Sequence, residues 1–329
     1  MYPLSAARPS AAPSAPAGKT VVTMLLAAHT LLLSFAPATL LNATSSWHTL
    51  SYGPDPEGIV QDDHQGLTGT MGAQGAALLL QGNTRGYLIS NYKAERWSQV
   101  VYEKLDLLGK TLRWTADLSA VECGCNAALY LVAMDHPTSS SPGYCDIQSK
   151  DHACLELDLM EANQKAVQTT LHTQTGTGVD GTCNQYGCAR NWGKASSKAY
   201  GAGSDHAIDS TRPFEMAASF DDEGRMTLTL AQGGGDAHTL WDVATAGNWP
   251  AGSNHSGVPA AASEAVRLAM RKGLVLVLSL WGGGDMSWLD GGCRGAYQQC
   301  QLGSAQAVVS NLRVENASRK GGAVLVEGR

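Results

Sequence analysis

The sequence has few aromatic residues, few charged residues and no run of basic residues. Phenylalanine, tyrosine and tryptophan make up 6% of the 329 residues and charged residues 16%, whereas glycine occurs 37 times. This composition is typical of turn-rich all-β or mixed folds and argues against a helical bundle. The formal net charge is −6 and no basic patch stands out. We therefore expect no binding to nucleic acid, whereas a neutral polymer such as a glycan is a suitable partner.

The chain also lacks internal repeats and a Pro/Ser-rich linker to a second module. Its length suits one large domain or two modest ones. We expect an N-terminal segment over residues 1–41, one main domain over 42–318 and a C-terminal tail over 319–329.

The N-terminal segment has the pattern of an export signal. Residues 1–18 are rich in proline, alanine and serine, and Lys19 precedes the apolar run TVVTMLLAAHTLLLSFAPA. The small residues at its end predict a secretory signal cleaved after Ala38. A signal anchor is the main alternative because the run approaches the length that spans a membrane; a buried core helix is the third. We therefore expect a secreted protein, or a signal-anchored membrane form.

No cysteine occurs before residue 123, and no Cys-x2-Cys pair occurs anywhere. The eight cysteines are Cys123, Cys125, Cys145, Cys154, Cys183, Cys188, Cys293 and Cys300. An even number in an exported chain favours disulfides over a zinc site. We predict no metal and no cofactor.

Most of the remaining sequence reads as short strands joined by polar turns. Residues 214–235 predict a hairpin with Asp221–Gly224 as its turn, and residues 273–281 (GLVLVLSLW) predict a strand buried on both faces. The single good helix candidate is 263–273, capped by Ser263 and ended by Gly273. We expect an all-β sandwich of two antiparallel sheets, a jelly roll with few short helices.

The stretch ACLELDLMEAN (153–163) places three acids among apolar residues. In a strand, Glu156 and Asp158 share one face, opposite the face of Leu155, Leu157 and Leu159. Glu161 has the wrong parity for the acidic face. A β-bulge after Asp158 would return Glu161 to it, so that three carboxyls converge.

Converging carboxyls cannot all ionise freely, so one would keep its proton near neutral pH. A carboxylate beside a carboxylic acid suits glycoside hydrolysis, in which one attacks and the other protonates the leaving oxygen. Two alternatives stay open from these residues. The stretch could form a helix with a solvated acidic face, because its residues are good helix formers, or it could belong to a calcium site.

The acidic stretch, Glu156-Leu-Asp158-Leu-Met-Glu161-Ala-Asn163, resembles the Glu-x-Asp-x-x-Glu motif of glycoside hydrolase family 7. This family contains cellobiohydrolases and endoglucanases with a concanavalin-like β-jelly roll. The resemblance implies that Glu156 is the nucleophile, Glu161 the acid/base and Asp158 the assistant of the nucleophile. His172, eleven residues after the acid/base, would line the cleft on the leaving-group side.

The resemblance extends strongly from Tyr102 to Arg313 and faintly over 47–92. Segments 102–135 and 141–149, the strand KGLVLVLSLW with the later SWLD, and Arg294-Gly295 all resemble family segments in the same order. The further substrate-binding residues implied are Asn126, Tyr130, Tyr144, Asp146, Gln148, Trp281, Trp288 and Arg294. The two tryptophans would be sugar platforms, since aromatic faces stack on sugar rings, although either could be simple core.

The resemblance also implies disulfides. Cys145 pairs with Cys154, and Cys183 with Cys188, because the usual family partners of the latter two are absent. Cys123 pairs with either Cys300 or Cys293, and Cys125 takes the other.

This chain departs from the family pattern in being short. The segment after His172 is trimmed, Gly178 stands near a sugar-binding arginine, and Gly282 replaces an aspartate. These losses predict an open cleft without the tunnel of a cellobiohydrolase, and no cellulose-binding module or linker is seen.

We therefore predict a retaining endo-acting hydrolase of β-1,4-glucosidic bonds in cellulose-like or mixed-linkage glucans. It would be a monomer with a polysaccharide substrate and no obligate protein partner. The alternatives are a non-catalytic glucan-binding, lectin-like protein and a wall-remodelling transglycosylase.

Overall fold

The computed structural model describes residues 47–316, apart from 52–55, 64–65, 75–76, 91–93, 95, 151, 174–182, 195–197, 243–257 and 293–299. The predicted export segment, the C-terminal tail, Gly178 and Arg294 lie outside the described residues. Within the part described, no helix is both long and apolar enough to cross a membrane.

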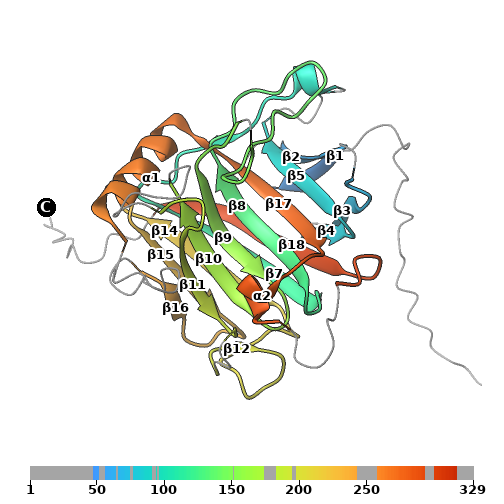
Figure 1. Ribbon diagram of the computed structural model, residues 1–329, viewed down its shortest axis with the longest axis vertical. Coiled ribbons are helices and arrows are strands. Elements are labelled where there is room, and N and C mark those ends of the chain that lie inside the picture. The colour runs from blue at the N-terminus through green and yellow to red at the C-terminus, as the bar shows by residue number, and fades with distance from the viewer. Residues whose placement is uncertain are drawn as a thin grey trace, which may run out of the picture. The chain divides into compact units, whose positions relative to one another are not determined.

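Two large sheets pack face to face (Figure 1). In spatial order, the front sheet contains β1 (Trp47–Ser51), β2 (Pro56–Gln61), β5 (Thr84–Ile89), β17 (Leu274–Gly282), β8 (Cys125–Val132), β9 (Glu156–Ala162), β10 (Val167–His172) and β11 (Cys188–Trp192), with β6 (Lys104–Leu105) also paired to β17. The back sheet contains β16 (His238–Trp241), β15 (Met226–Ala231), β14 (Phe214–Phe220), β7 (Lys110–Ala120), β18 (Gln306–Asn316), β4 (Ala77–Gln81) and β3 (Thr70–Gln74). Neighbouring strands in both sheets are antiparallel.

The few other elements are short. They are η1 (Trp97–Gln99), α1 (Ala260–Lys272), α2 (Ser287–Asp290) and a parallel pair of two-residue strands, β12 (Tyr200–Gly201) and β13 (Ile208–Asp209). This architecture confirms the predicted jelly-roll sandwich with few short helices.

The core lies between the sheets because alternate side chains of each strand point inward. Trp114 and Trp241 of the back sheet are fully buried in the same cluster as Leu129 and Leu278 of the front sheet. On the other face of β17, Val277 packs in a second apolar cluster, so this strand is buried on both faces as predicted.

The predicted hairpin is confirmed, since β14 and β15 pair as far as Phe220 and Met226 around the turn. The predicted helix start is wrong. Helix α1 begins at Ala260 after Pro259, so Ser263 lies inside the helix, buried, and caps nothing. Alanines 260 to 262 are strong helix formers and extend the helix upstream of the serine. The C-terminal signal is correct, because Gly273 ends the helix with a φ of 84°.

The disulfides settle the pairing that the sequence left open. Cys145–Cys154 and Cys183–Cys188 form as expected, and Cys125 pairs with Cys300. Cys123 is also disulfide-bonded, while Cys293 lies outside the described residues. The Cys125–Cys300 bond joins the start of β8 to the segment before β18.

Candidate active site

The acidic stretch is strand β9, not a helix, and it contains the expected bulge. On β8, the neighbours Leu129 and Tyr130 pair with Met160 and Asp158, so β9 has one residue more than its partner. On β10, the register shifts at the same place, between the partners of Asp158 and Glu161. The residues that point into the core are Leu157, Leu159, Met160 and Ala162. The bulge therefore returns Glu161 to the face of Glu156 and Asp158.

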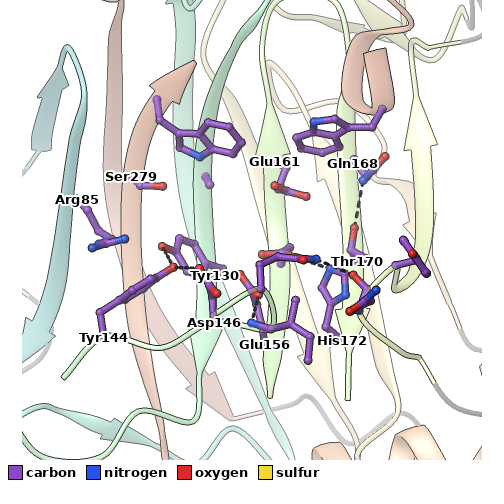
Figure 2. A pocket seen from close by; sticks show the side chains of 18 of the residues that line it. Arg85, Tyr130, Tyr144, Asp146, Glu156, Glu161, Gln168, Thr170, His172 and Ser279 are labelled. Carbon is purple, nitrogen blue, oxygen red and sulfur yellow. Dashed lines mark hydrogen bonds and ion pairs between the residues drawn. The ribbon is translucent and has the colours of Figure 1, made fainter. Parts of the chain in front are cut away.

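Three rows of side chains cross the outer face of the front sheet, one through each acid. Residues that pair across strands present their side chains on the same face. The row of Glu161 contains Gln168, Ala128, Ser279 and Arg85. The row of Asp158 contains Thr170, Tyr130, Val277 and Tyr87. The row of Glu156 contains His172, Val132 and Val275. The pairing of β5, β17, β8, β9 and β10 thus gathers residues remote in sequence (Figure 2).

A cavity of about 560 Å³ opens over these rows. Of the predicted site residues, those that line it are Glu156, Asp158, Glu161, His172, Tyr130, Tyr144, Asp146, Gln148, Trp281 and Trp288. Asn126 is fully buried and does not line it, but its Nδ2 donates to Glu161 Oε1 at 3.0 Å. Asn126 is therefore placed to hold the side chain of Glu161.

Several lining residues were missed by the sequence analysis, among them Arg85, Gln168, Thr170, Ser279, Gln185 and Tyr186. A signal existed for some of them. Gln168 and Thr170 have the same parity as His172 in one strand, and Ser279 has the parity of Trp281. No local sequence signal pointed to Arg85, because only the pairing of β5 with β17 brings it beside Ser279.

Ile147 and His172 hold two of the three acids of β9 in place. The backbone N–H of Ile147 donates to Glu156 Oε2 at 2.9 Å. His172 approaches Asp158 through Nε2, 3.3 Å from Oδ2, while its Nδ1 lies 3.0 Å from the carbonyl oxygen of Asn184. The histidine ring is thus held from both sides.

Burial raises the pKa of all three carboxyls. It raises the pKa of Asp158 to about 7, against an opposing hydrogen bond with Glu156. The pKa values of Glu156 and Glu161 are raised well above the usual range by burial and, second, by the negative charge of Asp158. The Ile147 N–H and the His172 charge favour ionised Glu156, and His172 and Asn126 favour ionised Glu161. The cluster therefore keeps protons that isolated carboxyls would have lost at neutral pH.

This cluster predicts that the fold loses stability as the pH rises. A carboxyl whose pKa is raised on folding binds more protons in the folded state between its two pKa values, so the free energy of unfolding falls with pH there. The decline should begin near the unfolded value of about 4 and continue through about 7, where Asp158 titrates, and above. Urea unfolding at pH 5 and pH 8 should differ by a few kcal/mol, and Glu161→Gln should reduce the difference. Parallel pH curves for the wild type and the variant would contradict this origin.

The opposite end of the cavity, at β5, is a fixed polar network. Arg85 makes an ion pair with buried Asp62 at 2.8 Å, donates to the Tyr87 hydroxyl at 2.9 Å and lies over the Tyr144 ring, 3.5 Å from its centroid. The Tyr144 hydroxyl donates to Asp146 at 3.0 Å. A charged and aromatic wall therefore faces the acids across the cavity.

The two tryptophans of the cavity lie next to each other. The rings of Trp281 and Trp288 are nearly parallel, at 22°, with centroids 6.3 Å apart. Both are partly buried against the small apolar cluster of Ala166, Met286 and Leu289. Each tryptophan therefore packs on apolar neighbours and also lines the cavity.

No cluster of three or more metal-ligating side chains occurs among the described residues. The three acids face one another and hydrogen-bond donors.

The chain is similar in sequence to known fungal enzymes. It is 28% identical over 262 residues to endo-β-1,4-glucanase celB of Emericella nidulans, covering 59% of each chain. It is 28% identical over 249 residues to endoglucanase EG-1 of Hypocrea jecorina, covering 64% of this chain and 51% of that one. It is 26% identical to endoglucanase 1 of Humicola insolens, covering 72% and 71%. The chain thus spans about half to three fifths of the length of the first two relatives.

Solved structures share its fold. A GH7 family cellobiohydrolase from Daphnia pulex matches with a TM-score of 0.59 at 18% identity, covering 84% of this chain and 97% of that one. The native endocellulase EGI of Humicola insolens matches with a TM-score of 0.58 at 19% identity, covering 83% and 97%. No family model matches the chain.

Proposed function

We propose that the chain is a member of glycoside hydrolase family 7 and that it is a retaining, endo-acting hydrolase of β-1,4-glucosidic bonds. The observation that carries the proposal is the bulge in β9, which gathers three carboxyls on the floor of one cavity, with Asp158 buried and the two glutamates half-buried. Burial and mutual repulsion give this cluster both an ionised and a protonated carboxyl at the same pH, as hydrolysis with retention requires.

In the proposed mechanism, Glu156 attacks the anomeric carbon and forms a glycosyl ester. Glu161 gives its proton to the departing oxygen and then takes a proton from the water that hydrolyses the ester. The Ile147 N–H and the hydrogen bond with Asp158 hold the Glu156 carboxyl in place. Asn126 fixes the Glu161 rotamer.

An endo mode of action is supported by the names of the sequence relatives, which are endoglucanases, and by open space just beyond β17. Gly283 and Gly284, which follow β17, have positive φ angles, and a Cβ on either would meet no atom within 4 Å. The cavity is also rich in carboxyls, so it suits neutral glucans better than anionic ones. We propose soluble cellulose-like or mixed-linkage β-glucans as substrates, and export as a disulfide-bonded monomer.

The proposal is tested by assaying the purified, oxidised protein on barley β-glucan, carboxymethylcellulose and xylan. We expect reducing ends and a rapid fall in viscosity from the β-glucan, less product from carboxymethylcellulose and least from xylan. Proton NMR of the first product should show the β anomer. An α anomer would overturn retention, and glycan binding without product would favour a lectin. Products longer than the substrate would mean transglycosylation.

Asp158 provides a test through the pH profile. Burial is the largest cause of the raised pKa of Glu161, and the negative charge of Asp158 is the second. Asp158→Asn should therefore move the alkaline limb of kcat/KM to lower pH, because Glu161 would lose its proton earlier. Loss of a hydrogen bond to a charged group should also lower kcat/KM roughly 10- to 100-fold. An unchanged alkaline limb would show that Asp158 does not act on the proton of Glu161.

A further inference from the structure

The strongest feature outside the acidic cluster is a short loop at the end of the cavity beyond His172. This loop, Cys183–Cys188, leads into β11 and is closed by its own disulfide. Its Tyr186 side chain is 62% exposed, the most exposed large apolar side chain among the described residues, yet it lines the cavity. A single exposed aromatic residue is ordinary on a surface. An exposed aromatic ring on a fixed loop at the rim of a cavity of about 560 Å³ is less common and suggests a ligand contact.

The loop is fixed internally as well as by its disulfide. The Asn184 side chain accepts a hydrogen bond from the Tyr186 N–H at 2.8 Å, and its carbonyl accepts one from the Gly187 N–H at 2.9 Å. Gly187 has a φ of 72°, which favours glycine. The backbone that carries the tyrosine therefore has one defined conformation.

The loop is also attached to the site itself. His172 Nδ1 lies 3.0 Å from the Asn184 carbonyl, and Gln148 Nε2 donates to the Gln185 carbonyl at 2.8 Å. A Cβ on Gly187 would lie 2.2 Å from a Thr170 methyl carbon and 2.6 Å from a His172 ring carbon. The loop thus rests directly on two lining residues of β10, without space for a side chain between them.

Tyr186 and Arg85 belong to opposite ends of the cavity. Arg85 is on β5, and the loop follows β10, with β17, β8 and β9 between them. At the usual spacing of strands, four steps across the sheet amount to about 19 Å, enough for several sugar units. The family resemblance implies that the His172 end receives the leaving-group part of the glucan, and the proposed mechanism is read in this direction.

We propose that Tyr186 is an aromatic platform for a glucosyl unit on the leaving-group side, and that it selects substrates that extend in this direction. The proposal rests on the proposed function for the direction of the glucan. Tyrosine offers a flat apolar face to the C–H face of a pyranose, and its fixed loop keeps the entropy cost of binding low. Such a contact is worth about a 3- to 10-fold preference.

The test is the choice of bond in cellopentaose labelled at its reducing end, which occupies the leaving-group side. Wild type and Tyr186→Phe should release mostly labelled fragments of two or more units. Tyr186→Ala should lower the ratio of these fragments to labelled glucose by roughly 3- to 10-fold, a readout that a merely structural role would not move. Leu268→Ala, an exposed apolar residue of α1 that does not line the cavity, is the matched control. An unchanged ratio in active Tyr186→Ala would overturn the platform.

A binding measurement separates this proposal from the proposed function. Calorimetry compares cellotetraose binding to Glu156→Gln and to the double variant with Tyr186→Ala. Weaker binding by the double variant, roughly 3- to 10-fold, supports the platform even if the wild type cleaves nothing and the hydrolase proposal fails. Equal affinities would overturn it.

Discussion

Replacing Glu156 with glutamine should lower kcat/KM on barley β-glucan by about 10⁴-fold or more, because removal of a nucleophile abolishes the covalent route. Glutamine has the size of glutamate and can still accept the Ile147 N–H bond of 2.9 Å, so the fold should persist. Without a buried acid of raised pKa, the variant should be at least as stable as the wild type at pH 8. Reducing-end release and urea unfolding measure the two effects.

Glu122→Gln is the matched control for this variant. Glu122 is exposed in the turn between β7 and β8 and does not line the cavity, so the same substitution should leave activity unchanged. Residual activity of Glu156→Gln within 10-fold of the wild type would remove Glu156 from the role of nucleophile. A loss in a variant that no longer unfolds cooperatively would be structural, and the stability measurement identifies that case.

The second large effect is expected at Glu161, and it should depend on the leaving group. Glu161→Ala removes the group that protonates the departing oxygen, so cleavage of β-glucan should fall by about 10²- to 10⁴-fold. An aryl β-cellobioside with an acidic phenol leaves without protonation, so formation of the glycosyl ester should be affected far less. Its hydrolysis should then stall at the ester, because no base activates water. Burst kinetics with dinitrophenyl and unsubstituted phenyl cellobiosides measure this difference.

Rescue of activity by azide distinguishes the role of Glu156 from that of Glu161. In Glu161→Ala, azide needs no general base and should attack the ester on Glu156, which restores turnover and gives the β-configured glycosyl azide. In Glu156→Ala, azide would replace the missing nucleophile and give the α-configured product. The opposite pattern would exchange the roles of the two residues. Glu122→Ala, tested with azide, provides the baseline.

The local pattern of the sequence predicted much of this site. Alternation along β9 separated its leucines from its acids, and the wrong parity of Glu161 predicted the bulge that both neighbouring strands display. Gly273 marked the end of α1 correctly. Ser263 did not mark its start, because capping residues compete with helix propensity and the alanines before it continue the helix. Signals of this kind lie within one segment, so they can be read without knowing its neighbours.

The sequence by itself determined which residues of a strand have their side chains on the same face, since the period of two follows from backbone geometry. What only the tertiary structure decided is which strands lie side by side. The pairing of β5 with β17 brings Arg85 beside Ser279, and the Cys125–Cys300 bond fixes a pairing that spacing left open. The contact of the Cys183–Cys188 loop with His172 makes Tyr186 part of the cavity. Register across strands depends on long-range packing of the two sheets, which no local pattern records.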